Sequence, residues 1–144
     1  LFKANIGPEG LLMIGFAASF AAKLADTFGS EIGKCWGRRT ILITTLRPVP
    51  AGTDGGITLE GTFASAVGSL FMTAVMVLLL FVPADLSALV VVVVGFAATL
   101  LESLLGALAQ HKYPWLSNEI VNGIQTCLAA LLAITIAGIY GLGT

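Results

Sequence analysis

Three long runs of the sequence carry no charged residue, and their lengths predict membrane-spanning helices. A helix needs about 20 apolar residues to cross a bilayer core, and the runs cover 61–84, 86–101 and 120–144. The middle run reaches this length only if its helix continues through Glu102 to about residue 110. A fourth apolar stretch begins near Pro8, a residue that suits a first helical turn. We predict an all-α polytopic membrane helix bundle with about four transmembrane spans, near 8–33, 59–83, 86–110 and 118–142.

The five consecutive valines at 90–94 are the one stretch that favours a β-strand. A lone strand in lipid leaves its backbone groups unpaired, so helix is the better prediction here as well.

Composition argues against a soluble domain and against a nucleic-acid-binding protein. Hydrophobic residues make up 57% of the 144 residues and charged residues only 10%, with a mean hydropathy of +0.98. A soluble domain carries about 25% charged residues. The net charge of −1 leaves no basic field for nucleic acid. We predict one integral membrane domain over 1–144, and the start at Leu1 instead of Met predicts an N-terminally truncated chain.

The basic residues predict the orientation in the membrane. Five of the seven lie in the predicted loop 34–58 and in the connection 111–117, namely Lys34, Arg38, Arg39, Arg47 and Lys112. Basic loops stay on the cytoplasmic side. We therefore expect both connections on the cytoplasmic (or stromal) face, and the Asp85 turn with both chain ends on the opposite face.

Polar residues recur at helical spacing near the cytoplasmic ends of the predicted spans, which places each set on one helical face. The sets are Lys23, Asp26, Thr27, Ser30 and Glu31; Thr99, Glu102, Ser103, Gly106 and Gln110; Asn118, Asn122, Gln125 and Thr126. We expect these faces to converge on one polar chamber. A weaker set in the second span, Thr62, Ser65, Ser69 and Thr73 with Gly61 and Gly68, is typical of helix packing in membranes.

Three acidic residues at membrane depth, Asp26, Glu31 and Glu102, are candidates for a functional site because buried charge is costly there. They lack an equal number of basic partners, and carboxylate oxygens together with substrate phosphates are what Mg²⁺ prefers. The alternative is that Lys23 and Asp26, three residues apart, simply neutralise each other.

The predicted loop adds candidates for anion binding. Its turn Gly52-Thr53-Asp54-Gly55-Gly56 has backbone N–H groups that can cradle a phosphate, and Arg38, Arg39 and Arg47 can clamp phosphate oxygens. Such a run is also common in tight turns, and loop arginines also serve as topology determinants. The Gly-Lys-Ser/Thr ending of a Walker loop is absent.

Several motifs together resemble an integral membrane family that includes phytyl phosphate kinase of the plant and cyanobacterial vitamin E pathway. They are residues 26–33 (DTFGSEIG), 44–45 (TT), 49–62 (VPAGTDGGITLEGT), 102–107 (ESLLGA) and 115–122 (WLSNEIVN). Their order and spacing agree with the family over about 11–140. The 59–62 and 115–122 stretches are closest to the photosynthetic branch, which points to a cyanobacterial or plastid membrane.

The resemblance implies transfer of a phosphoryl group from a nucleoside triphosphate to phytyl phosphate, and we expect the nucleotide to be CTP. The product is phytyl diphosphate, a precursor for tocopherol and phylloquinone synthesis. Under this hypothesis Asp26, Glu31 and Glu102 hold Mg²⁺, and Asp54 is a further catalytic ligand. The nucleotide and phosphate groups are bound by Lys23, Ser30, Arg47, Gly52, Thr53, Gly55, Gly56, Asn118 and Asn122.

Other functions remain open at this point. A kinase for geranylgeranyl or farnesyl phosphate uses the same site, and a polyprenol kinase would need a base, for which Asp26 is the first candidate. Intramembrane carboxylates also occur in lipid or ion transporters. A purely structural membrane subunit is the remaining class.

Overall fold

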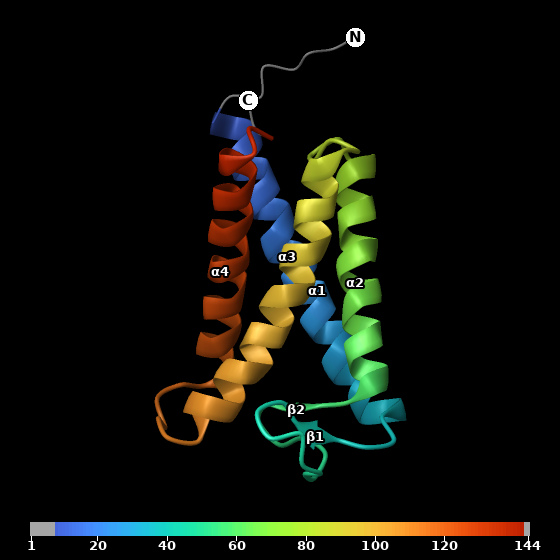
Figure 1. Ribbon diagram of the computed structural model, residues 1–144, viewed down its shortest axis with the longest axis vertical. Coiled ribbons are helices and arrows are strands. Elements are labelled where there is room, and N and C mark those ends of the chain that lie inside the picture. Colours follow the sequence, from blue (N-terminus) through green and yellow to red (C-terminus); the bar gives the residue numbers. More distant parts are fainter. Residues whose placement is uncertain (1–7, 143–144) are drawn as a thin grey trace.

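A computed structural model describes residues 8–142 as four long helices with a compact loop at one end (Figure 1). The helices are α1 (Pro8–Trp36), α2 (Leu59–Leu78), α3 (Leu86–Leu105) and α4 (Asn118–Ile139), and a π-helical turn, η1 (Gly106–Gln110), continues α3. Each of the four, with η1 added to α3, is long and apolar enough to cross a membrane. Within the described part of the chain, the predicted all-α membrane bundle is confirmed.

Side-chain caps mark the starts of three helices. Thr58 accepts a hydrogen bond from the Gly61 N–H at 2.9 Å at the start of α2, Asp85 accepts one from Ser87 at 2.7 Å before α3, and Ser117 accepts one from Ile120 before α4. Such caps satisfy amides that have no partner inside the helix. The valine run lies within α3, as predicted.

Two local features differ from the sequence prediction. Helix α2 ends at Leu78 instead of near residue 83, because Leu80 adopts a positive φ of 61° and breaks the helical geometry. The loop after α1 also contains a small antiparallel pair, β1 (Ile41–Leu42) and β2 (Gly56–Ile57). This pair folds the loop back toward the bundle.

The two basic connections lie at the same end of the bundle. Figure 1 shows the α1–α2 loop and the α3–α4 connection together at the bottom, with the turn between α2 and α3 at the top. This arrangement places Lys34, Arg38, Arg39, Arg47 and Lys112 on one side. We call it the loop end of the bundle.

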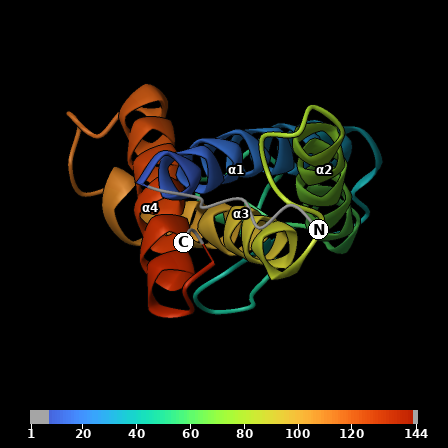
Figure 2. The ribbon, with the colours of Figure 1, turned by 90° about the horizontal axis from the view of Figure 1, so that it is seen from above.

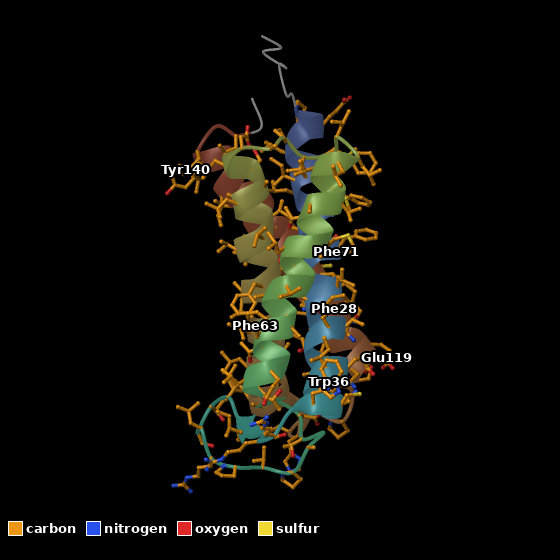
Figure 3. All side chains as sticks on the ribbon, turned by 90° about the vertical axis from the view of Figure 1, so that its right-hand side faces the viewer. Phe28, Trp36, Phe63, Phe71, Glu119 and Tyr140 are labelled. Carbon is orange, nitrogen blue, oxygen red and sulfur yellow. The ribbon has the colours of Figure 1, made fainter. Side chains whose placement is uncertain are left out.

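Alanines make up more than half of the buried apolar core, and many large apolar side chains face outward. Helix α1 contacts the other three helices, and α1 and α3 lie between α2 and α4 (Figure 2). The buried residues of α1 and α4 are mostly alanines, and Gly68 of α2 sits directly against the backbone of Leu24. Phe63 and Phe71 are 72% and 58% exposed and project outward (Figure 3). This inversion is typical of helices that pack closely in lipid.

Candidate functional site

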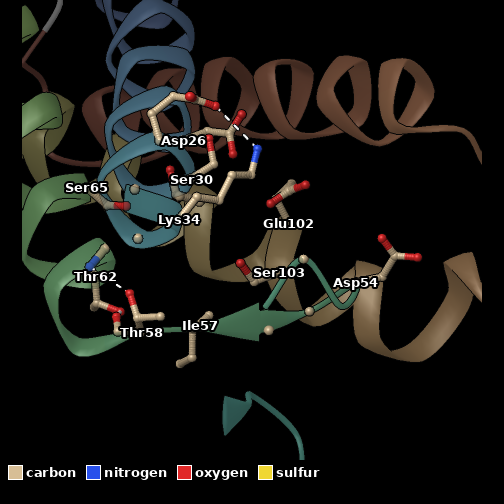
Figure 4. A pocket seen from close by; sticks show the side chains of 18 of the residues that line it. Asp26, Ser30, Lys34, Asp54, Ile57, Thr58, Thr62, Ser65, Glu102 and Ser103 are labelled. Carbon is tan, nitrogen blue, oxygen red and sulfur yellow. Dashed lines mark hydrogen bonds and ion pairs between the residues drawn. The ribbon is translucent and has the colours of Figure 1, made fainter. Parts of the chain in front are cut away.

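A polar pocket of about 420 Å³ lies at the loop end of the bundle (Figure 4). All four helices and the α1–α2 loop contribute to its lining. Of the predicted site residues, all except Arg47 line it: Lys23, Asp26, Ser30, Glu31, Gly52, Thr53, Asp54, Gly55, Gly56, Glu102, Asn118 and Asn122. The polar faces therefore converge as the helical spacing predicted.

Lys23 joins α1 to α4 within the pocket. Its Nζ donates to Asp26 Oδ2 at 2.9 Å and to Asn122 Oδ1 at 3.0 Å. The neutralising pair considered in the sequence analysis is thus present. The second carboxylate oxygen of Asp26 accepts no hydrogen bond within residues 8–142, so this oxygen is available to a ligand while the ion pair persists.

Glu102 is a pocket carboxylate without a hydrogen-bond partner among residues 8–142. It lies half-buried on α3 and makes no hydrogen bond or ion pair with any residue that the structure describes. Asp26, Lys23 and Asp54 are close enough to act on it electrostatically. A half-buried carboxylate beside two other acidic groups is costly unless a cation compensates it.

The predicted three-carboxylate cluster does not form. Glu31 is exposed and pairs with Lys34 at 3.3 Å, and over residues 8–142 no three Asp, Glu, His or Cys side chains gather closely enough to hold a metal ion. Mg²⁺ is usually held by one or two carboxylates together with substrate phosphates. Asp26 and Glu102 fit that mode, with Glu31 outside it.

The glycine turn is docked against η1. Gly52 and Gly55 have φ angles of +87° and +75°, which L side chains rarely adopt. A Cβ on Gly55 would lie 2.7 Å from both the N and the Cα of Ala107 in η1, so only glycine fits this contact. The contact brings the turn close to the end of α3 that carries Glu102.

The turn leaves backbone donors unused. The N–H groups of Gly52, Asp54 and Gly55 donate no hydrogen bond within the part of the chain that the structure covers, whereas Gly56 N–H donates to the Thr53 carbonyl at 2.8 Å. Asp54 and Gly55 are successive, and unpaired amides of successive residues in such a turn suit a phosphate anion.

Arg47 lies outside the pocket lining. It is exposed in the loop between β1 and β2, just after Leu46, whose φ of 55° reverses the chain there. Arg38 and Arg39 are also exposed and are not lining residues. The predicted phosphate clamp by loop arginines is therefore not formed in this structure.

Some lining residues were not predicted as site residues. Thr58, Thr62, Ser65, Ser103 and Gln110 all line the pocket. Gln110 Nε2 donates to Asn118 Oδ1 at 2.9 Å and so orients that amide. Four of the five belonged to the polar stripes, so helical periodicity was the available signal. Thr58, which follows β2, lies outside these stripes but within the 49–62 motif.

The fold and the pocket define a polytopic membrane protein with a polar, carboxylate-bearing pocket at one end of its helix bundle. The chain belongs to the integral membrane protein family DUF92, whose profile matches residues 2–130.

Three relatives illustrate the similarity. The chain is 47% identical to the uncharacterized membrane protein sll0875 of Synechocystis over 90% of this chain and 51% of the relative. It is 42% identical to the chloroplastic protein VTE6 of Arabidopsis thaliana, over 86% of this chain and 38% of the relative. It is 39% identical to the uncharacterized membrane protein MJ0933 of Methanocaldococcus jannaschii, over 86% of this chain and 51% of the relative. The chain thus spans about half or less of the length of these relatives. No solved structure matches it significantly.

Proposed function

We propose that this chain belongs to a membrane-embedded kinase that transfers a phosphoryl group from CTP or another nucleoside triphosphate to phytyl phosphate. The observation that carries the proposal is the pocket itself. Its lining includes Asp26 and Glu102, two carboxylates with free oxygens, together with a glycine turn that has three unused backbone donors. A cation site beside an anion site is what a metal-bound triphosphate requires.

The proposed reaction needs positioning more than covalent chemistry from the protein. A terminal phosphate oxygen of the acceptor attacks the γ-phosphorus of the nucleotide. The bond from that phosphorus to the β–γ bridging oxygen breaks, and its electron pair leaves with the nucleoside diphosphate. Because the acceptor is already an anion at neutral pH, no general base is required.

The pocket residues divide this work between them. Asp26 and Glu102 would hold Mg²⁺, which when bound neutralises charge on the transferring phosphates. The amides of Gly52, Asp54 and Gly55 would donate to phosphate oxygens, and Lys23 would face the negative charge while remaining paired to Asp26 and Asn122. The Gln110–Asn118 pair would bind the nucleotide or the acceptor phosphate.

The membrane setting favours a lipid-borne acceptor. The pocket lies at the end of an apolar bundle, where an isoprenoid tail can remain in lipid while its phosphate reaches the polar groups. The motifs resembling the family of phytyl phosphate kinase, and the identity to a cyanobacterial and a chloroplastic protein, support phytyl phosphate and a photosynthetic membrane. The basic loop end would face the cytoplasm or stroma.

The proposal is tested by product formation in purified full-length protein supplied with phytyl phosphate, CTP and Mg²⁺. We expect phytyl diphosphate, its loss on chelation with EDTA, and its loss in Asp26→Asn. Geranylgeranyl and farnesyl phosphate run in parallel define the tail, and ATP, GTP and UTP define the nucleotide. A folded protein that yields no diphosphate from any pair would refute the kinase and favour a transporter.

A further inference from the structure

Helix α4 carries a buried amide, Gln125, that the proposed phosphoryl transfer does not use. Its side chain is 2% exposed and lies one helical turn beyond Asn122, away from the loop end. Its Nε2 donates to the backbone carbonyl of Ala22 on α1 and to Thr99 Oγ1 on α3, both at 3.2 Å. Gln125 therefore joins three helices at one point, which we call the three-helix junction.

Thr99 is the second member of this junction. Thr99 is only 6% exposed. Its hydroxyl oxygen lies 3.3 Å from the Ala22 carbonyl oxygen and 3.1 Å from the Gly95 carbonyl oxygen. In an α-helix the Ala22 carbonyl also accepts the backbone N–H four residues later, which belongs to Asp26. The junction is thus bonded to the same backbone turn that carries a pocket carboxylate.

Each helix of the junction carries a pocket residue about one turn nearer to the loop end. These residues are Asp26 on α1, Glu102 on α3 and Asn122 on α4. Residues three or four apart share a helical face. The separations between the three pocket groups consequently depend on how the junction holds the helices.

The junction is not arranged for maximal stability. Gln125 Oε1 is buried and has no hydrogen-bond partner within residues 8–142, and an unsatisfied acceptor in an apolar interior is destabilising. An apolar side chain of similar length would avoid this cost. Stability alone therefore does not account for the amide.

We propose that Gln125 is a positioning residue of the pocket. By tying Ala22 to Thr99 it sets the separation of the Asp26 and Glu102 carboxylates, and through it the affinity for a divalent cation with its triphosphate. The identity of that ligand rests on the proposed function.

The test compares Gln125→Met with Thr135→Val in the full chain. Thr135 lies on the same helix, is exposed, and donates only to the Leu131 carbonyl of its own helix. We would measure the Kd for Mn²⁺, with a non-hydrolysable CTP analogue present, by electron paramagnetic resonance. The KM for CTP and the Tm in detergent complete the comparison.

We expect Gln125→Met to weaken Mn²⁺ binding about 10-fold or more, as loss of an outer-shell partner does. The KM for CTP should rise with it, whereas the Tm stays level or increases. Thr135→Val should leave Mn²⁺ binding at the wild-type value. Thr99→Val should act in the same direction as Gln125→Met, and the double variant should lose less than the product of the two effects because both residues act at one junction.

Wild-type Mn²⁺ affinity in a folded Gln125→Met protein would overturn the inference. If that variant does not fold, wild-type affinity in Thr99→Val overturns it instead. If the wild type binds Mn²⁺ more tightly than Gln125→Met but makes no diphosphate, the kinase is refuted and the positioning role is supported. No Mn²⁺ binding in the wild type would refute both.

Discussion

Replacing Gly55 by alanine tests whether the contact between the glycine turn and η1 matters for activity, apart from the backbone strain that alanine introduces. Gly52 provides a matched control, because both glycines lie in the same turn and both have a positive φ. A Cβ on Gly52 meets nothing within 4 Å, whereas one on Gly55 would lie 2.7 Å from the Ala107 N and Cα. The two alanine variants therefore share the backbone strain and differ in the collision with η1.

The structure sets the size of each effect. A left-handed backbone conformation costs an L-residue about 1 kcal/mol or slightly more. In either variant this lowers the population of the docked turn about five-fold. Ordinary carbon contacts lie at about 3.5–4.0 Å, so Gly55→Ala must also move the turn away from η1 by about 1 Å. A displacement of that size near reacting groups costs about 100-fold, or about 2.7 kcal/mol.

The assay is kcat/KM for phosphoryl transfer from CTP to phytyl phosphate, with the Tm in detergent as the folding control. We expect Gly52→Ala to lose about five-fold and Gly55→Ala at least about 100-fold, with similar Tm values because the turn lies outside the helix core. Equal losses in the two variants would refute the idea that docking on η1 positions the turn.

Four further substitutions test other parts of the structure. Asp26→Asn and Glu102→Gln should each lower turnover by more than about 100-fold while the protein stays monodisperse in gel filtration, and near-normal turnover in either would exclude it as a metal ligand. Gly68→Val should lower stability by about 1–3 kcal/mol, read as a lower Tm, because a Cβ there lies 2.9 Å from the Leu24 carbonyl oxygen; an unchanged Tm would contradict that packing. Thr62→Ala removes a hydroxyl that donates at 2.8 Å to the carbonyl of Thr58, the residue that caps α2. About 1 kcal/mol of stability and little activity should be lost, and abolished turnover would instead reveal a substrate contact.

Features local to each helix were enough to predict the spans and the polar helix faces from the sequence. Three charge-free runs and the apolar stretch after Pro8 predicted the four spans. The spacing of Lys23, Asp26, Glu102 and Asn122 placed each on the face that meets the pocket. Both inferences depend only on neighbours within one helix, which the sequence displays directly. The basic residues likewise grouped the two connections at one end before any fold was known.

What only the tertiary structure decided are contacts between segments far apart in the chain. Lys23 bonds to Asn122 across 99 positions and Gln125 to the Ala22 carbonyl across 103, and the same packing leaves Glu31 exposed and Arg47 outside the pocket. These outcomes follow from the rotation and crossing of helices, which small residues such as Gly68 set by allowing close backbone approach. A polar stripe in the sequence specifies the direction of its own helix face, but which residue of another helix meets it depends on how the two helices pack.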